Sequence, residues 1–179
     1  MGSLAVILSG FPRHSETFAL NELQALENCG LLAGAFALKE GDGTPFHPGY
    51  ESLYQKVEVI SELDTQGQIN FITERLRQKQ ISAIHAYFAH TPTDVAMNVA
   101  KNLNVPYGFS THAKDARKVS SADLAHRAKG ASCIVACNPD VASELKSFGA
   151  TVTLMPHGVD LNRFSPSSLP AKPLRLLAV

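Results

Sequence analysis

Short apolar runs alternate with helix-forming segments along almost the whole chain, and this alternation is the strongest constraint on the fold. Seven runs have the length and composition of buried strands: residues 4–8, 32–38, 57–60, 81–88, 105–110, 132–136 and 152–155. Strands that alternate with helices pair in parallel, and the helices cover both faces of the sheet. The sequence therefore predicts a doubly wound α/β domain with a mostly parallel sheet.

The helices between these strands are marked by start and stop signals. We expect them over residues 15–29 and 68–79, from Thr91 toward the strand at 105, and over residues 121–129 and 138–148. The hydroxyl of Thr91 is the predicted cap of the third helix, with Pro92 in its first turn. Gly30 and Gly149 follow the last residues of two helices, where glycine ends a helix readily.

Composition and charge exclude several classes of protein. Lysine and arginine number 16 and aspartate and glutamate also 16, which removes the positive field that nucleic-acid binding requires. The longest apolar stretch, 31–38, is too short to span a bilayer, and the N-terminus lacks the features of a signal peptide. We therefore expect a cytoplasmic protein. Bases outnumber acids after Asp64, which leaves open a peripheral contact with anionic lipid heads at the inner face of a membrane.

The three cysteines are odd in number and lie among apolar residues. Cys29, Cys133 and Cys137 are therefore interpreted as buried free thiols in a reducing compartment. No second pair of ligands has zinc spacing, and His112 with Asp115 is too small a set for a site. The sequence predicts no metal and no cofactor.

The last residues differ from the rest of the chain. We expect residues 1–160 to form the doubly wound domain. Residues 161–173 are rich in proline and serine and are predicted to be a linker. Residues 174–179 have the composition of one more strand, which is expected to begin a second domain.

Polar residues follow several predicted strands directly. Ligands of an open parallel sheet bind beyond the carboxyl ends of its strands, so these residues are expected on one rim. They are Gly10, Phe11, Arg13, Ser15 and Glu16 after the first strand, His90 after the fourth, His112, Lys114 and Asp115 after the fifth, and His157 after the seventh.

Each rim residue also has a purely structural interpretation. Arg13 could only neutralise Glu16, and His90 could only satisfy backbone groups in a turn. His112, which stands with a lysine and an aspartate directly after an apolar strand, is harder to explain without a function. Such groups are costly to desolvate unless they have partners.

Several nucleotide and hydrolase motifs are absent from the chain. No G-x-G-x-x-G follows a strand, and there is neither a P-loop nor a G-x-S-x-G elbow. These absences disfavour a dehydrogenase-type dinucleotide fold, P-loop hydrolysis and an α/β-hydrolase.

Four segments in order resemble the motifs of glycosyltransferase family 4, particularly members that act in exopolysaccharide (colanic-acid-like) assembly. They are PRHSETFALNE at 12–22, HAYFA with TDVA over 85–96, FSTHAKD at 109–115 and PHGVDLNRF at 156–164. The resemblance implies one half of a GT-B fold, with two Rossmann-like domains and the active site between them. The half present here would be the N-terminal, acceptor-binding domain. The missing half would bind the nucleotide-sugar donor and carry the E-x7-E motif.

The resemblance also implies roles for the rim. His112 is similar to the family histidine near the reacting sugar, where it would orient a hydroxyl or support departure of the leaving group. The loop 10–15 would lie against the donor diphosphate, and Lys114 and Asp115 would contact the acceptor or hold their loop. Family members retain anomeric configuration and generally need no divalent metal.

The expected function is therefore that of a retaining glycosyltransferase acting on a saccharide or lipid-linked saccharide, inactive as this chain alone. Two alternatives remain open at the level of sequence. One is a stand-alone module that binds a sugar or phosphate without catalysis. The other is half of a sugar-nucleotide epimerase, whose catalytic acids and bases cannot be located in these residues.

Overall fold

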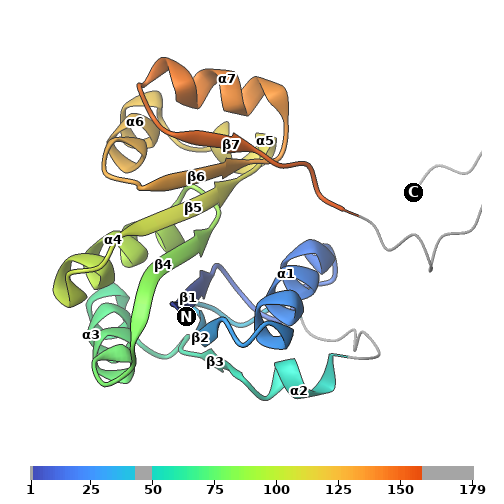
Figure 1. Cartoon of the computed structure of the whole chain (residues 1–179), viewed down its shortest axis with the longest axis vertical. Helices are drawn as coiled ribbons and strands as arrows, with labels where there is room; N and C mark the ends of the chain where they lie inside the picture. Colours follow the sequence, from blue (N-terminus) through green and yellow to red (C-terminus); the bar gives the residue numbers. More distant parts are fainter. Residues whose placement is uncertain (1, 43–49, 159–179) are drawn as a thin grey trace, which may run out of the picture.

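The computed structural model describes residues 2–42 and 50–158, in which strands and helices alternate as the sequence predicts (Figure 1). The strands are β1 Ser3–Leu8, β2 Leu32–Ala37, β3 Val57–Val59, β4 Ile81–Tyr87, β5 Tyr107–Thr111, β6 Cys133–Ala136 and β7 Val152–Leu154. The helices are α1 Thr17–Asn28, α2 Glu51–Tyr54, α3 Thr65–Leu76, α4 Thr91–Leu103, α5 Ala113–Ala116, α6 Ser121–Lys129 and α7 Pro139–Ser147. The predicted linker and final strand lie outside the described residues.

All seven strands form one sheet, and every pairing in it is parallel. Their order is β3-β2-β1-β4-β5-β6-β7. The chain builds outward from β1 to β3, returns to β4 beside β1, and then builds outward in the opposite direction. The strand order therefore reverses between β1 and β4, which is the place where open α/β sheets bind ligands. The α/β, Rossmann-like prediction is confirmed.

The reversal also distributes the helices over the two faces of the sheet. Helices α1 and α2 pack on one face, over β1 to β3, around Leu23 and Leu53. Helices α3, α4, α6 and α7 pack on the other face and share the larger core, which includes Phe109 and Ile134. Crossovers between parallel strands are right-handed. Helices that connect strands added in one direction along the sheet therefore lie on one face, and helices that connect strands added in the other direction lie on the opposite face. Among residues 2–42 and 50–158, strands β4 to β7 consequently have no helix over most of the face that α1 occupies.

That partly uncovered face corrects the interpretation of the cysteines. Cys29 and Cys133 are exposed and Cys137 is half-buried, so the prediction that all three are buried is wrong. Cys29 lies at the end of α1, beyond its last full turn. Cys133 lies on β6, and its side chain is exposed. Apolar neighbours in the sequence do not reveal which side of a sheet a helix covers.

Two helix starts differ from their predicted positions. Helix α3 begins at Thr65 rather than at residue 68, because the Asp64 carboxylate accepts a hydrogen bond from the Gly67 amide at 2.7 Å and caps the helix. Helix α4 is capped by His90 rather than by Thr91. The His90 carbonyl accepts the first-turn bond from the amide of Thr93 at 2.8 Å, so the helix starts one residue earlier.

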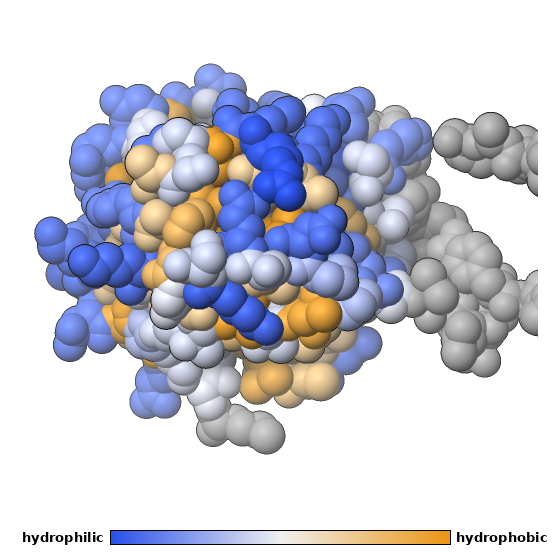
Figure 2. Space-filling model, turned by 90° about the horizontal axis from the view of Figure 1, so that it is seen from above, coloured by the Kyte–Doolittle hydropathy of each residue, from blue (hydrophilic) through white to orange (hydrophobic). Residues whose placement is uncertain are grey.

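The surface seen from the α7 end mixes hydrophilic with hydrophobic residues (Figure 2). The edge strand β7 contributes exposed apolar side chains, Leu154 among them, and Met155 follows it with 56% of its surface exposed. No helix within residues 2–42 and 50–158 is long and apolar enough to cross a membrane.

Candidate active site

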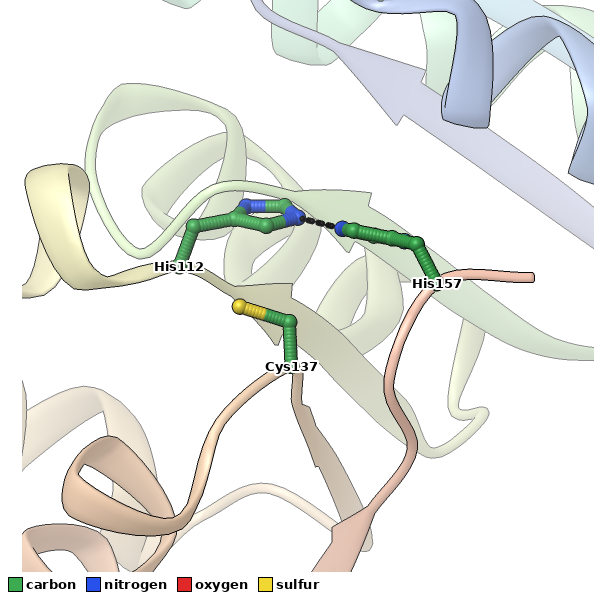
Figure 3. Close-up of side chains that lie close together, drawn as sticks. All are labelled: His112, Cys137 and His157. Carbon is green, nitrogen blue, oxygen red and sulfur yellow. Dashed lines mark hydrogen bonds between the residues drawn. The ribbon is translucent and has the colours of Figure 1, made fainter. Parts of the chain in front are cut away.

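The carboxyl ends of β5 and β7 bring together two histidines that are far apart in the sequence. His112 directly follows β5, and His157 lies three residues beyond β7. Their Nε2 atoms are 2.9 Å apart and their rings are stacked, with centroids 4.9 Å apart (Figure 3). Both residues were predicted on one rim, and the structure places them in direct contact.

Asp115 holds the backbone around His112 in place. Its buried carboxylate accepts hydrogen bonds from the amides of Ala89 and His112, at 2.8 and 2.7 Å, and from the Thr111 hydroxyl at 2.9 Å. Burial alone would raise the pKa of Asp115, but these bonds and the nearby His112 ring lower it below the usual value. The carboxylate is therefore charged at neutral pH and joins the ends of β4 and β5.

Two phenylalanines form the wall behind the histidine pair. Phe18, in the first turn of α1, has its ring centroid 4.7 Å from that of His112 and 4.3 Å from that of His157. Phe88, after β4, lies 5.2 Å from His112 and stacks on His90. Phe18 was not among the residues predicted on the rim.

Glu22 and Tyr87 extend the site beyond the predicted residues. The Tyr87 hydroxyl donates a hydrogen bond to the Glu22 carboxylate, whose other oxygen lies 3.7 Å from Nδ1 of His157. Burial and the adjacent carboxylate raise the pKa of Tyr87, so its phenol stays protonated. Glu22 follows Phe18 by four residues, which puts the two on one side of α1. The four-residue spacing from Phe18 is the sequence feature that could have indicated Glu22 as a residue of the site.

The pKa of His157 lies below its usual value. Burial lowers its pKa, and the neighbouring His112 lowers it further, while Glu22 opposes both effects. Since the two rings meet through their Nε2 atoms, at most one proton occupies the space between them.

A cavity of about 340 Å³ opens beside the pair, between α1 and the uncovered part of the sheet. Its polar end is lined by Glu22, His85, Tyr87, Ser110, His112 and His157, and its apolar remainder by Leu4, Val6, Leu26, Leu31, Val135 and Met155. Within the sheet, His85 places Nε2 2.8 Å from the Ser110 hydroxyl. A cavity with one polar end and apolar walls suits a ligand of mixed polarity.

The predicted residues after β1 do not join the histidine pair directly. Phe11 is 5% exposed and packs against Tyr54 in the smaller core. The Arg13 guanidinium lies over Gly10, where a Cβ would come within 2.9 Å of it, and it reaches Glu16 at 3.8 Å. Burial raises the pKa of Glu16, an effect that the adjacent Arg13 opposes.

Three other predicted residues stand apart from the cavity. Ser15 and Lys114 are exposed. The His90 ring stacks on Phe88, and burial lowers its pKa. His90 occupies the N-cap position of α4, but its side chain makes no capping hydrogen bond.

The strand order and the cavity beside the β1–β4 reversal define an α/β domain whose ligands lie at the carboxyl edge of a parallel sheet. The chain belongs to Glycosyltransferase Family 4, whose family model matches residues 44–163, more than half of the chain. Membership implies sugar transfer and, in general, binding of a nucleotide-sugar donor and an acceptor. The chain has no match among the curated proteins.

Proposed function

We propose that this domain is the N-terminal, acceptor-binding half of a retaining glycosyltransferase of GT-B architecture. The enzyme would move a sugar from a nucleotide-sugar to a saccharide or lipid-linked saccharide, as in exopolysaccharide assembly. Family membership supports transfer in general, and the four sequence motifs support the narrower assignment. Residues 1–160 would form this half, with residues 161–173 as the linker and 174–179 as the first strand of the donor domain.

One observation supports this proposal above the others, namely the environment of His112. Its ring is held between two phenylalanines, its backbone is fixed by Asp115, and its Nε2 faces His157 beside the cavity. Its Nδ1 lies 3.6 Å from the Asp115 carboxylate, which favours a proton on that nitrogen. The Nε2 atom then carries a lone pair, which would accept a hydrogen bond from a sugar hydroxyl in place of its 2.9 Å contact with Nε2 of His157.

The apolar walls of the cavity support an acceptor of mixed polarity. A saccharide at the polar end would meet Glu22, Tyr87 and the histidine pair, which offer both donors and acceptors. The remaining walls would contact the apolar part of a lipid-linked acceptor. The donor is assigned mainly to the absent half, so this chain alone should turn nothing over.

The loop 10–15 is proposed to face the donor diphosphate when the two halves close together. Its support is the resemblance, together with the arginine over Gly10 and the following N-terminus of α1, both of which favour anionic oxygens. Ser15 is exposed there and has a hydroxyl to offer. Lys114, also exposed, is the further candidate for contact with an anionic substrate.

Replacing His112 by alanine in the complete enzyme tests the assignment. We expect turnover to fall by roughly 10²–10⁴-fold, the usual contribution of a group that exchanges protons or hydrogen bonds with the reacting atoms. The matched control is His126→Ala, because His126 is exposed on α6 and is not among the residues that line the cavity. NMR of the product with a panel of donors reads both the rate and the anomeric configuration.

Different results would contradict different parts of the proposal: the role of His112, the retaining mechanism and the inactivity of this chain alone. Unchanged turnover in His112→Ala would end the role of that residue, and an inverted product would end the retaining mechanism. Turnover by the 179-residue chain alone would contradict its assignment as one inactive half.

A further inference from the structure

The polar end of the cavity contains a third side chain that can bind a metal. Cys137 directly follows β6, the strand between the two that lead to the histidines. Its sulfur points toward the histidine pair (Figure 3). The ligand atoms of His112, Cys137 and His157 all lie within 4.8 Å of one another. Three strand ends thus supply two imidazoles and one thiol to a single point.

We propose that His112, Cys137 and His157 form a zinc-binding site. Thiolate and imidazole are the ligands that Zn²⁺ prefers, at about 2.3 Å for sulfur and about 2.0–2.1 Å for nitrogen. Ligand atoms on a tetrahedral zinc ion are therefore roughly 3.3–3.8 Å apart. The two Nε2 atoms, 2.9 Å apart, need to separate slightly, and the sulfur needs to approach by about 1 Å.

The groups behind each histidine favour metal binding through Nε2. Nδ1 of His112 lies 3.6 Å from the Asp115 carboxylate, and Nδ1 of His157 lies 3.7 Å from that of Glu22. A nearby carboxylate favours the proton on Nδ1 and a lone pair on Nε2; with a shortening to hydrogen-bond distance this would be the carboxylate–histidine–zinc arrangement. Here the two outward lone pairs face each other, an arrangement that requires a proton or a cation between them.

The thiol has a polar neighbour of its own. The Asn138 amide donates a hydrogen bond to the Cys137 sulfur at 3.6 Å. Cys137 is half-buried and lines the cavity, so a metal ion can reach it from there. With three protein ligands, a bound zinc ion would keep a fourth position for water or a substrate oxygen.

The sequence did not predict this site because its ligands lack any spacing typical of zinc proteins. Cys137 stands 25 residues after His112, and His157 stands 20 residues after Cys137. The inference goes beyond the proposed transfer function and does not depend on it. A zinc ion on Nε2 of His112 and a sugar hydroxyl on the same atom exclude each other, so the two proposals are tested separately.

Cobalt titration of the 179-residue chain, first freed of metal by a chelator, tests the site. We expect thiolate-to-cobalt absorption in the near ultraviolet together with the intense visible bands of tetrahedral cobalt, both displaced by Zn²⁺. Cys137→Ser should abolish the thiolate band and lower zinc affinity by at least about 100-fold, since it removes one of three ligands. The matched control is Cys133→Ser, an exposed cysteine on β6, and it should leave both unchanged.

A second variant guards against a folding defect. His157→Ala should also lose the tetrahedral bands while its far-ultraviolet circular dichroism matches that of the wild type, because its ring is largely outside the core. Glu22→Gln should keep the thiolate band but weaken zinc binding by about 10–100-fold. The proposal is overturned if the wild type shows no thiolate band, or if the band survives in Cys137→Ser. Neither result bears on sugar transfer.

Discussion

His85 shows how one buried residue makes stability depend on pH. It lies in β4 at the polar end of the cavity, and its Nε2 is 2.8 Å from the Ser110 hydroxyl. Burial lowers its pKa from 6.5 to about 4. Between these two values the unfolded chain binds a proton at this residue and the folded chain does not. Stability should therefore fall as the pH falls through this range.

We expect the free energy of unfolding to drop by roughly 1–3 kcal/mol between pH 7 and pH 4.5 because of His85. His85→Gln keeps a hydrogen-bonding side chain but cannot titrate, so its loss over the same range should be smaller by that amount. Urea unfolding curves of both proteins at the two pH values provide the measurement. His90 and His157, whose pKa values are also lowered, titrate in both proteins and cancel in the comparison. Equal losses would contradict the role of His85.

At the scale of elements, one carboxylate joins two strand ends to a short helix. Asp115 belongs to α5, while its hydrogen-bond donors come from the segment after β4, from the end of β5 and from His112. Buried donors left without an acceptor cost considerably more than the bond itself contributes. The position of the histidine pair depends on this junction.

Asp115→Ala should lower the free energy of unfolding by about 2–4 kcal/mol, because three donors lose their acceptor. Asp115→Asn keeps one acceptor oxygen and should cost less. The control is Asp140→Asn, an exposed residue in the first turn of α7, with an expected effect below about 1 kcal/mol. Chemical denaturation of the three variants and the wild type measures the free energy of unfolding of each. Similar losses at both positions would show that the junction contributes little.

For the whole molecule, burial decreases from the middle of the sheet to its β7 edge. The central strand β1 has its inner residues fully buried, including Ala5 and Ile7, whereas β7 has no fully buried residue. Within the described part of the chain, β7 pairs with β6 alone. Segments with few buried contacts open locally, while the centre opens only when the domain unfolds.

Amide hydrogen exchange of the 179-residue chain should therefore be slower in β1 than in β7 by several orders of magnitude. Peptides that cover residues 3–8 and 152–155 report the two strands by mass spectrometry. Strand β4, next to β1, serves as an internal reference and should follow β1. Equal protection of β7 and β1 would mean that the edge is more stable than its burial indicates.

The alternation of elements could be predicted because its causes are local. Ser121–Lys129 forms the helix predicted there, since Ser120 accepts a bond from the Asp123 amide at one end and Gly130 follows the other. Asn138 caps α7 in the same way, and Gly149 follows that helix with φ at +77°. Each helix cap and each glycine after a helix lies within a few residues of the helix end that it marks. These ends can therefore be predicted from the sequence alone.

The rim could be predicted only in part. Parallel pairing sends every carboxyl end to one edge, which is why His112 and His157 were expected on a common side. Their contact, the partnership of His157 with Glu22 and the approach of Cys137 depend on which strands are neighbours. That order follows from packing helices on both faces of the sheet, a property of the whole core.

What the sequence determined by itself is the class of fold and the residues available to its functional edge, because hydrophobic periodicity and capping are local physical effects. Only the tertiary structure decided which of those residues meet. Strand order and the helices packed on each face are long-range consequences of burying apolar surface, and among residues 2–42 and 50–158 they leave one part of the sheet without a covering helix. That uncovered part forms the cavity, and the strand ends beside it bring a thiol and two imidazoles to one place.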